Sequence, residues 1–137
     1  MLLSRAAEAA LKALPLLDPR GPEAPGREAR ALALACGEPA PFLGKVLQKL
    51  ARAGLLRSKR GRTGGFVLGR PASEVTLADV VLAVEGAADL EKLFSLPEGP
   101  AGAFLVPARD ELVARLTGTT LARLRRGAPR EAPNGAP

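Results

Sequence analysis

The sequence has 137 residues, of which 47% are hydrophobic and only 3% aromatic, and it carries a formal net charge of +6. A chain of this length can bury one modest core, and the shortage of aromatic residues means that Leu, Val and Ala must build it. No apolar run approaches the roughly 20 residues of a membrane span, the absence of histidine removes the commonest general base and metal ligand, and the positive charge indicates an anionic partner.

Apolar spacing and the positions of Gly and Pro predict the elements of the chain. In order they are helices over 2–17, 27–36 and 41–53, a β-hairpin over 55–69, and helices over 76–86, 105–116 and 121–124. Pro15 should kink or end the first helix, Gly37 should end the second, and Thr76 should cap the helix after the hairpin. The stretches 18–26 and 95–102 are predicted loops, and the tail 127–137 is predicted to be disordered.

The basic residues are concentrated in one part of the chain. Residues 39–73 contain no Asp or Glu and eight cations, whereas the remaining twelve cations are outnumbered by fourteen acids. The eight are Lys45, Lys49, Arg52, Arg57, Lys59, Arg60, Arg62 and Arg70. Regional basicity of this kind is typical of nucleic-acid binding. The alternative is an ordinary solvated basic face, which usually contains interspersed acids.

Two short helices, a tight turn and a basic hairpin together predict a winged helix-turn-helix. The fold class is therefore mostly α with a small β-hairpin wing (α+β), followed by a long C-terminal helix. The helix over 41–53 would enter the major groove with the side chains opposite its apolar stripe. Those side chains include Lys45, Gln48 and Lys49.

The hairpin would follow the DNA backbone and bring an arginine to the minor groove. Its cations include Lys59, Arg60 and Arg62. We expect Gly61, Gly64 and Gly65 to turn the backbone with positive φ and to let it approach phosphates. A glycine turn without function is one alternative. A nucleotide loop is another, but GRTGG lacks the GxxxxGK[ST] spacing and precedes a predicted strand.

The run FLGKVLQKLARAGLLRSKRGRTGGFVLGRPASEVTLADVVLAVEG, residues 42–86, resembles the Rrf-two (BadM-type) family of bacterial transcription regulators. The likeness lies in the recognition helix, the RG-x-x-GG-aromatic wing and the helix entered through a Thr-Leu pair, and it extends more weakly over 1–126. The resemblance implies a homodimer that binds double-stranded DNA at a near-palindromic operator, as a repressor or activator. The single cysteine fits the reducing cytoplasm, so a cytoplasmic location is expected. Matching positions imply DNA contacts by Ser4, Arg5, Pro41, Lys45, Ser58, Arg60, Gly61 and Gly64.

Many members of that family hold a [2Fe–2S] cluster through three cysteines between the Thr-Leu helix and the dimerisation helix. The matching segment here, 86–104, contains neither Cys nor His. Because thiolates are the usual ligands of such clusters, we expect no cluster and no other cofactor. The single cysteine, Cys36, excludes an internal disulfide and is expected to pack as a small hydrophobe, with a redox role as the alternative. Two alternatives then stay open: the sensing function is lost, or an unknown small-molecule or protein effector replaces the cluster.

The resemblance also divides the chain by role. It implies a DNA-binding domain over 1–86, a connector and dimerisation helix over 87–126, and a tail over 127–137. The expected dimer contacts are Leu105, Ala108, Leu112 and Leu116, although the leucines could instead pack on the chain's own core. The alternative function is a winged-helix module that regulates an enzyme partner and binds DNA weakly. Catalysis by the chain itself is not expected, because no nucleophile–base or paired-carboxylate arrangement is present.

Overall fold

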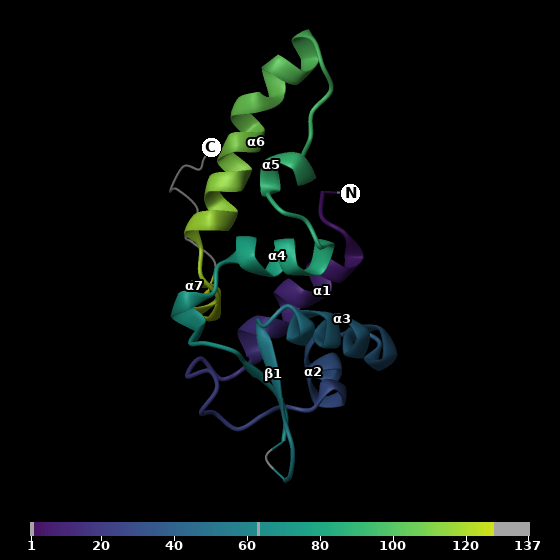
Figure 1. The fold of residues 1–137 in the computed structure, drawn as a ribbon, viewed down its shortest axis with the longest axis vertical. Coiled ribbons are helices and arrows are strands. Elements are labelled where there is room, and N and C mark those ends of the chain that lie inside the picture. Colours follow the sequence, from purple (N-terminus) through teal and green to yellow (C-terminus); the bar gives the residue numbers. More distant parts are fainter. Residues whose placement is uncertain (1, 63, 128–137) are drawn as a thin grey trace.

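The computed structural model describes residues 2–62 and 64–127. The elements of this part are α1 (Arg5–Ala13), η1 (Leu14–Leu16), α2 (Ala29–Cys36), α3 (Ala40–Arg52), β1 (Leu56–Lys59), β2 (Gly65–Leu68), η2 (Ala72–Glu74), α4 (Leu77–Glu85), α5 (Leu90–Leu93), α6 (Pro100–Gly118) and α7 (Leu121–Arg125). Figure 1 shows the hairpin and α6 at opposite ends of the long axis, with α1 to α4 between them. The expected disorder of 128–137 lies outside the described residues.

The first helix is shorter than the predicted span of 2–17. It starts at Arg5 because the Ser4 hydroxyl accepts a hydrogen bond from the Ala7 amide at 3.0 Å, which satisfies one of the free amides of the first turn. It gives way after Ala13 to the 3-10 turn η1, in which Pro15 occupies an early position. Pro15 therefore ends the regular α-helix, as predicted.

Helices α2 and α3 form the helix-turn-helix. Gly37 ends α2 in the left-handed conformation, with φ of +73°, as the sequence predicts. In α3 the apolar stripe is buried and packs into the main core. Its members are Leu43, Val46, Leu47 and Leu50. This burial fixes the rotation of α3 about its axis, so that the opposite side of the helix faces solvent.

The wing is an antiparallel pair in which Leu56 lies opposite Leu68 and Lys59 opposite Gly65. It has a third, short partner that the sequence did not reveal. Arg27 was predicted to begin a helix, but it pairs as a β-bridge with Phe66 through two backbone hydrogen bonds of 3.0 and 2.8 Å. The segment before α2 therefore supports β2 along its outer edge, and α2 starts two residues later than predicted.

Helix α4 joins the two halves of the molecule. Thr76 and Asp79 form a capping box at its start, and Gly86, with φ of +66°, ends it. Its residues Val80 and Val84 belong to the main core, whereas Ala78 and Val81 belong to a second cluster with Leu116 of α6. The chain then returns, since Leu121 of α7 is buried in the main core. Side chains from before and after residue 86, the predicted domain boundary, therefore pack together in both clusters.

The C-terminal segment differs most from the expected elements. Asp89 caps the short helix α5, which was not predicted. Helix α6 begins at Pro100, five residues before the predicted start, and Pro100 is well suited to the first turn because its missing amide would have no partner there. Gly102 allows the connector to lie close, because a Cβ at this position would be 1.7 Å from the Pro97 carbonyl oxygen.

Candidate nucleic-acid interface

The exposed side of α3 carries the residues predicted to read DNA. Pro41, Lys45, Gln48 and Lys49 are all exposed and lie on the side of the helix opposite the buried stripe. Gly44 lies within the same helix, and a Cβ at that position would meet nothing within 4 Å. The helix therefore presents an uncovered polar surface with the dimensions that suit a major groove.

The wing presents the second group of predicted residues. Arg57, Ser58, Arg60, Gly61 and Arg62 are exposed. Lys59 behaves differently, because its ammonium group donates a hydrogen bond to the Ala24 carbonyl oxygen at 2.7 Å. Its side chain ties the wing to the preceding loop, which leaves it less free than its neighbours to reach a phosphate.

The glycines of the wing have two different tasks. Gly61 has φ of +97° with open space around it, as expected for a turn that approaches a ligand. Gly64 is needed for close packing of the turn, because a Cβ there would lie 2.6 Å from the Lys59 carbonyl oxygen. Gly65 has φ of +117° and abuts Arg27, so it too serves packing within the protein.

We expect Gly65→Ala to lower the free energy of unfolding by about 2–4 kcal/mol, through backbone strain and overpacking. A Cβ at this position would lie 2.3 Å from the Arg27 carbonyl oxygen. Urea denaturation followed by circular dichroism, at equal protein concentrations, measures the change. Gly44→Ala is the control and should gain about 0.5–1 kcal/mol, because it adds a helix-favouring methyl group in open space. Equal stability of the Gly65→Ala variant and the wild type would contradict the packing role.

The start of α1 holds the remaining predicted contacts, Ser4 and Arg5. The Ser4 hydroxyl donates a hydrogen bond to a carboxylate oxygen of Glu85 and accepts one from the Ala7 amide as the cap of α1. The hydroxyl is therefore used within the protein both as a donor and as an acceptor. The Arg5 guanidinium is exposed, lies 5.0 Å from the ring centre of Phe42, and pairs with Glu38 at 3.2 Å. Arg5 is therefore held beside α3 and keeps most of its surface open to solvent.

Glu38, in the turn between α2 and α3, joins this turn to α1. Its side chain is 7% exposed and pairs with Lys12 as well as Arg5. The hydrogen bond from Lys12 lowers the pKa of Glu38, against the opposing effect of desolvation, and the charges of Lys12 and Arg5 lower it further. The carboxylate is thus favoured in the folded state, and it orients the first helix against the helix-turn-helix.

A pH series tests this contact. Because the folded-state pKa of Glu38 lies below its ordinary value of 4.5, its contribution to stability is complete above that value and is lost as the pH falls through the folded pKa. We therefore expect Glu38→Gln to lower the melting temperature at neutral pH and to match the wild type in strong acid. Glu111→Gln, which breaks an exposed pair with Arg115 on α6, should change little at any pH. A Glu38→Gln deficit that persists in strong acid would contradict the ionic explanation.

Most cations of 39–73 are not neutralised by acids of the described residues. Arg70 pairs with Asp79 at 3.0 Å, and Lys59 is bound to a carbonyl oxygen. Within residues 2–62 and 64–127, the other six have no carboxylate within 4.0 Å. They are Lys45, Lys49, Arg52, Arg57, Arg60 and Arg62, all exposed on α3 and the wing. These six, called the basic surface below, form the strongest feature for binding a polyanion.

The four expected dimer contacts on α6 have unequal exposure. Leu116 is 6% exposed and belongs to the second cluster, which leaves little of it for a partner. Leu112 also packs against that cluster, whereas Ala108 is exposed and Leu105 is 43% exposed. Phe104, which sequence reasoning missed, is 85% exposed on the same helix. The apolar surface available on α6 therefore centres nearer its N-terminal end than predicted.

Among the residues described, no helix is long and apolar enough to span a bilayer.

The sequence is similar to a known protein family and to individual bacterial proteins. A family model described as Rrf2, iron-dependent transcriptional regulator, matches residues 3–126. Protein aau3 of Rhizobium meliloti is 48% identical over 67 residues, which are 49% of this chain and 44% of that protein. The HTH-type transcriptional regulator IscR of Photorhabdus laumondii is 40% identical over 48 residues, 35% of this chain and 29% of that protein. The matched part thus spans less than half the length of these curated relatives.

The fold can also be compared directly. The structure of CymR, the global cysteine regulator of B. subtilis, matches with a TM-score of 0.78 over 94% of this chain and 99% of that chain, at 23% identity. At this identity the likeness concerns the fold alone. It confirms the predicted fold class, a mostly helical protein with a two-stranded wing.

Proposed function

The chain belongs to the Rrf2 family of transcriptional regulators, and on this basis we propose that it regulates transcription by binding double-stranded DNA as a homodimer at a near-palindromic operator. The observation that carries the proposal is the basic surface, whose six exposed cations have no carboxylate partner among the described residues. Phosphates are the natural counterions for such a surface, since neutralising them releases condensed cations from DNA.

The arrangement supports a specific docking mode. Helix α3 lies in the major groove, where Lys45, Gln48 and Lys49 reach base edges and phosphates. The wing lies along the backbone, with Arg60 and Arg62 beside the minor groove. Arg5 adds a contact at the start of α1. Residues 1–86 supply the DNA-binding part, and 87–126 supply the connector and the dimerisation helix.

We propose that α6 carries the dimer contact through its exposed apolar residues. Phe104, Leu105 and Ala108 are exposed in the N-terminal half of α6, a helix that projects beyond the body of the protein (Figure 1). A two-fold dimer would place one α3 and one wing on each half of a palindromic site. Leu112 completes this surface at its inner edge.

The description of the family model as iron-dependent raises the question of a metal cofactor. The donor set does not fit an iron–sulfur cluster. The segment 86–104 offers no thiolate or imidazole, and Cys36 ends α2 within the helix-turn-helix. Within the described part of the chain, no three Cys, His, Asp or Glu residues converge as a metal site would require. We therefore propose regulation without a cluster at this segment, and we assign the protein no catalytic activity.

Selection from genomic DNA tests the proposal. The purified protein is mixed with sheared genomic DNA of its source, and the retained fragments are sequenced. We expect an enriched inverted repeat, and we expect the Arg60→Ala, Arg62→Ala double variant to retain much less DNA of any sequence. Failure to enrich any sequence would overturn the proposal. Capture of an enzyme in a parallel pull-down would then favour a protein-interaction module.

A further inference from the structure

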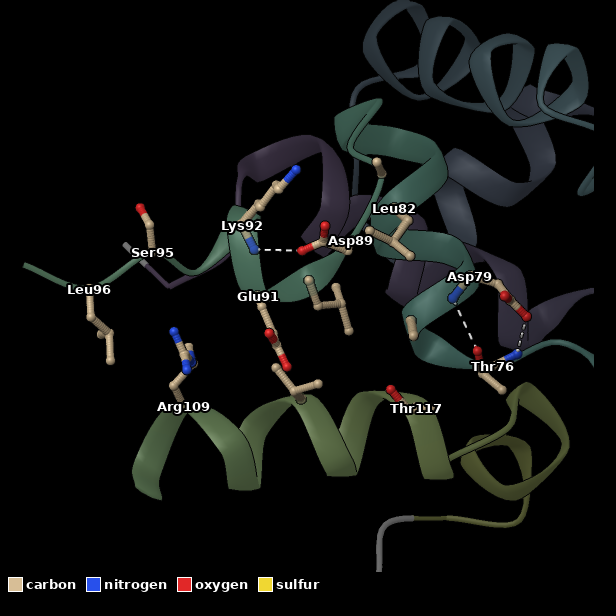
Figure 2. A pocket seen from close by; sticks show the side chains of 14 residues that line it. Thr76, Asp79, Leu82, Asp89, Glu91, Lys92, Ser95, Leu96, Arg109 and Thr117 are labelled. Atoms are coloured by element: carbon tan, nitrogen blue, oxygen red, sulfur yellow. Dashed lines mark hydrogen bonds between the residues drawn. The ribbon is translucent and has the colours of Figure 1, made fainter. Parts of the chain in front are cut away.

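A groove of about 840 Å³ lies between α4, α5 and α6, away from the basic surface. Its volume is within the usual range of small-molecule sites. Figure 2 shows it bounded by α4 at Thr76 to Leu82, by α5 with the following connector, and by α6. The lining includes Leu82, Leu90, Leu96 and Val113. The groove therefore combines apolar side chains with charged ones, which are Asp79, Asp89, Glu91, Lys92 and Arg109.

Arg109 is the distinctive group of this groove. It rises from α6 into the space between Leu96 and Glu91 (Figure 2), and its side chain is only 21% exposed. Its ionic partner among the described residues is Asp110, the next residue, whose Oδ1 accepts from Nε and Nη2 at 3.4 Å. Charge-assisted hydrogen bonds are normally about 2.7–2.9 Å long. The guanidinium thus keeps capacity for a closer anion.

The remaining charges restrict which anion can enter. Asp79 is already occupied by Arg70 at 3.0 Å and by the Thr76 amide at 2.9 Å. Asp89 and Glu91 form no ion pair within the described residues, although both line the groove, and Lys92, the second cation of the lining, is exposed. The two acids would repel a polyanion such as a nucleotide. A single carboxylate on Arg109, with an apolar body against Leu90 and Val113, matches both the charge and the lining.

The groove also has a mechanical connection to the DNA-binding half. The end of α6 is held at the start of α4, because the Leu77 amide donates to the Thr119 carbonyl oxygen at 2.9 Å and Thr76 bridges to Thr120. Helix α4 lines the groove with Leu82 and packs its Val80 and Val84 into the core that supports α3. A ligand that shifts α4 would thus act on the recognition helix.

We propose that this groove is an effector site that binds a small monocarboxylate with an apolar body through Arg109. The effector role rests on the DNA-binding function proposed above, whereas the binding itself does not. The two are therefore tested separately, first without DNA and then with it.

Binding is measured by ¹⁵N–¹H NMR of the full chain. The probes are hexanoate and cyclohexanecarboxylate, their neutral amides hexanamide and cyclohexanecarboxamide, and inorganic phosphate. We expect the carboxylates to shift amide signals of residues 89–96 and 109–117, and the amides and phosphate to leave them in place. Absence of carboxylate shifts, or equal shifts with the neutral amides, would overturn the proposal.

Variants assign the anion contact. We expect Arg109→Gln to weaken carboxylate binding about tenfold or more, because it removes a charged hydrogen-bond donor, and Arg109→Lys to bind with intermediate affinity. Arg115→Gln is the matched control, since Arg115 lies on the same helix outside the groove with a 70% exposed side chain. Unchanged binding by Arg109→Gln, or by Arg109→Lys if the first variant fails to fold, would exclude Arg109.

The second measurement is the affinity for the selected operator with and without the bound carboxylate. A change in affinity that Arg109→Gln abolishes supports the effector role. Groove binding with unchanged DNA affinity would overturn that role, and failure to bind any DNA would overturn the proposed function while the carboxylate site stands.

Discussion

Raising the salt concentration from about 50 to about 200 mM lowers the affinity of the dimer for its operator by roughly four decades, if each protomer neutralises about four phosphates. The number of phosphates is set by the basic surface, which offers six free cations per protomer, not all of which reach the backbone at once. Fluorescence anisotropy with a labelled operator, titrated at several salt concentrations, gives the slope. An affinity that is insensitive to salt would contradict the role of this surface.

The Arg60→Ala variant measures how much the wing contributes to the salt dependence of operator affinity. Arg60→Ala should weaken binding to all sequences alike and reduce the salt slope by about 2 for the dimer, one phosphate per protomer. It should change the free energy of unfolding by less than about 0.5 kcal/mol, the usual range for an exposed side chain. Arg115→Ala, an exposed arginine on α6, is the control and should leave the slope unchanged. A marked loss of stability would instead make Arg60 a structural residue.

The Phe104→Glu, Leu105→Glu double variant is expected to be monomeric and to lose about a hundredfold or more in operator affinity. Two linked half-site contacts gain about 10²–10⁴ over one through effective concentration, and this gain disappears with the dimer. The physical reason is that charges replace the apolar groups that we propose to meet a partner helix, of which Phe104 is 85% exposed. Sedimentation velocity measures the mass, and anisotropy measures the affinity.

Ala114→Glu is the control for this variant. Ala114 is exposed on α6, nine residues after Leu105, and therefore on the opposite side of the helix. The control should remain dimeric and bind DNA normally. A dimeric double variant would show that the apolar residues near the start of α6 are not the contact, and a monomeric control would show that charge on any side of α6 prevents association.

The local elements were largely predictable from the sequence. The stripe of α3, the caps Thr76 and Gly37, and the hairpin all depend on residues close together in the chain, so spacing and turn chemistry are sufficient to identify them. The short helix α5 also had a readable signal, since Asp89 precedes it as a cap. The early start of α6 is harder to predict, because Gly99 and Pro100 are typical of a loop, although Pro also favours the first turn of a helix.

The candidate site was less predictable where it depends on distant contacts. Ser4 was placed on DNA by resemblance, yet its hydroxyl bonds Glu85, which is 81 residues away. Lys59 is tied to Ala24, and Gly64 packs against the carbonyl oxygen of Lys59. The DNA contacts themselves stay predictions. Ser4, Lys59 and Gly64 each make a contact within the protein, whether or not they also contact DNA.

By itself, the sequence determined the order and type of most elements, the concentration of eight cations in a window without acids, and the absence of thiolates from residues 86–104. These are properties of composition and short-range periodicity, which hold before the chain folds. Only the tertiary structure decided which cations stay unpaired, which leucines of α6 its own core buries, and that Arg109 lies at a groove. Exposure and pairing depend on neighbours brought together across the chain, and packing alone selects those neighbours.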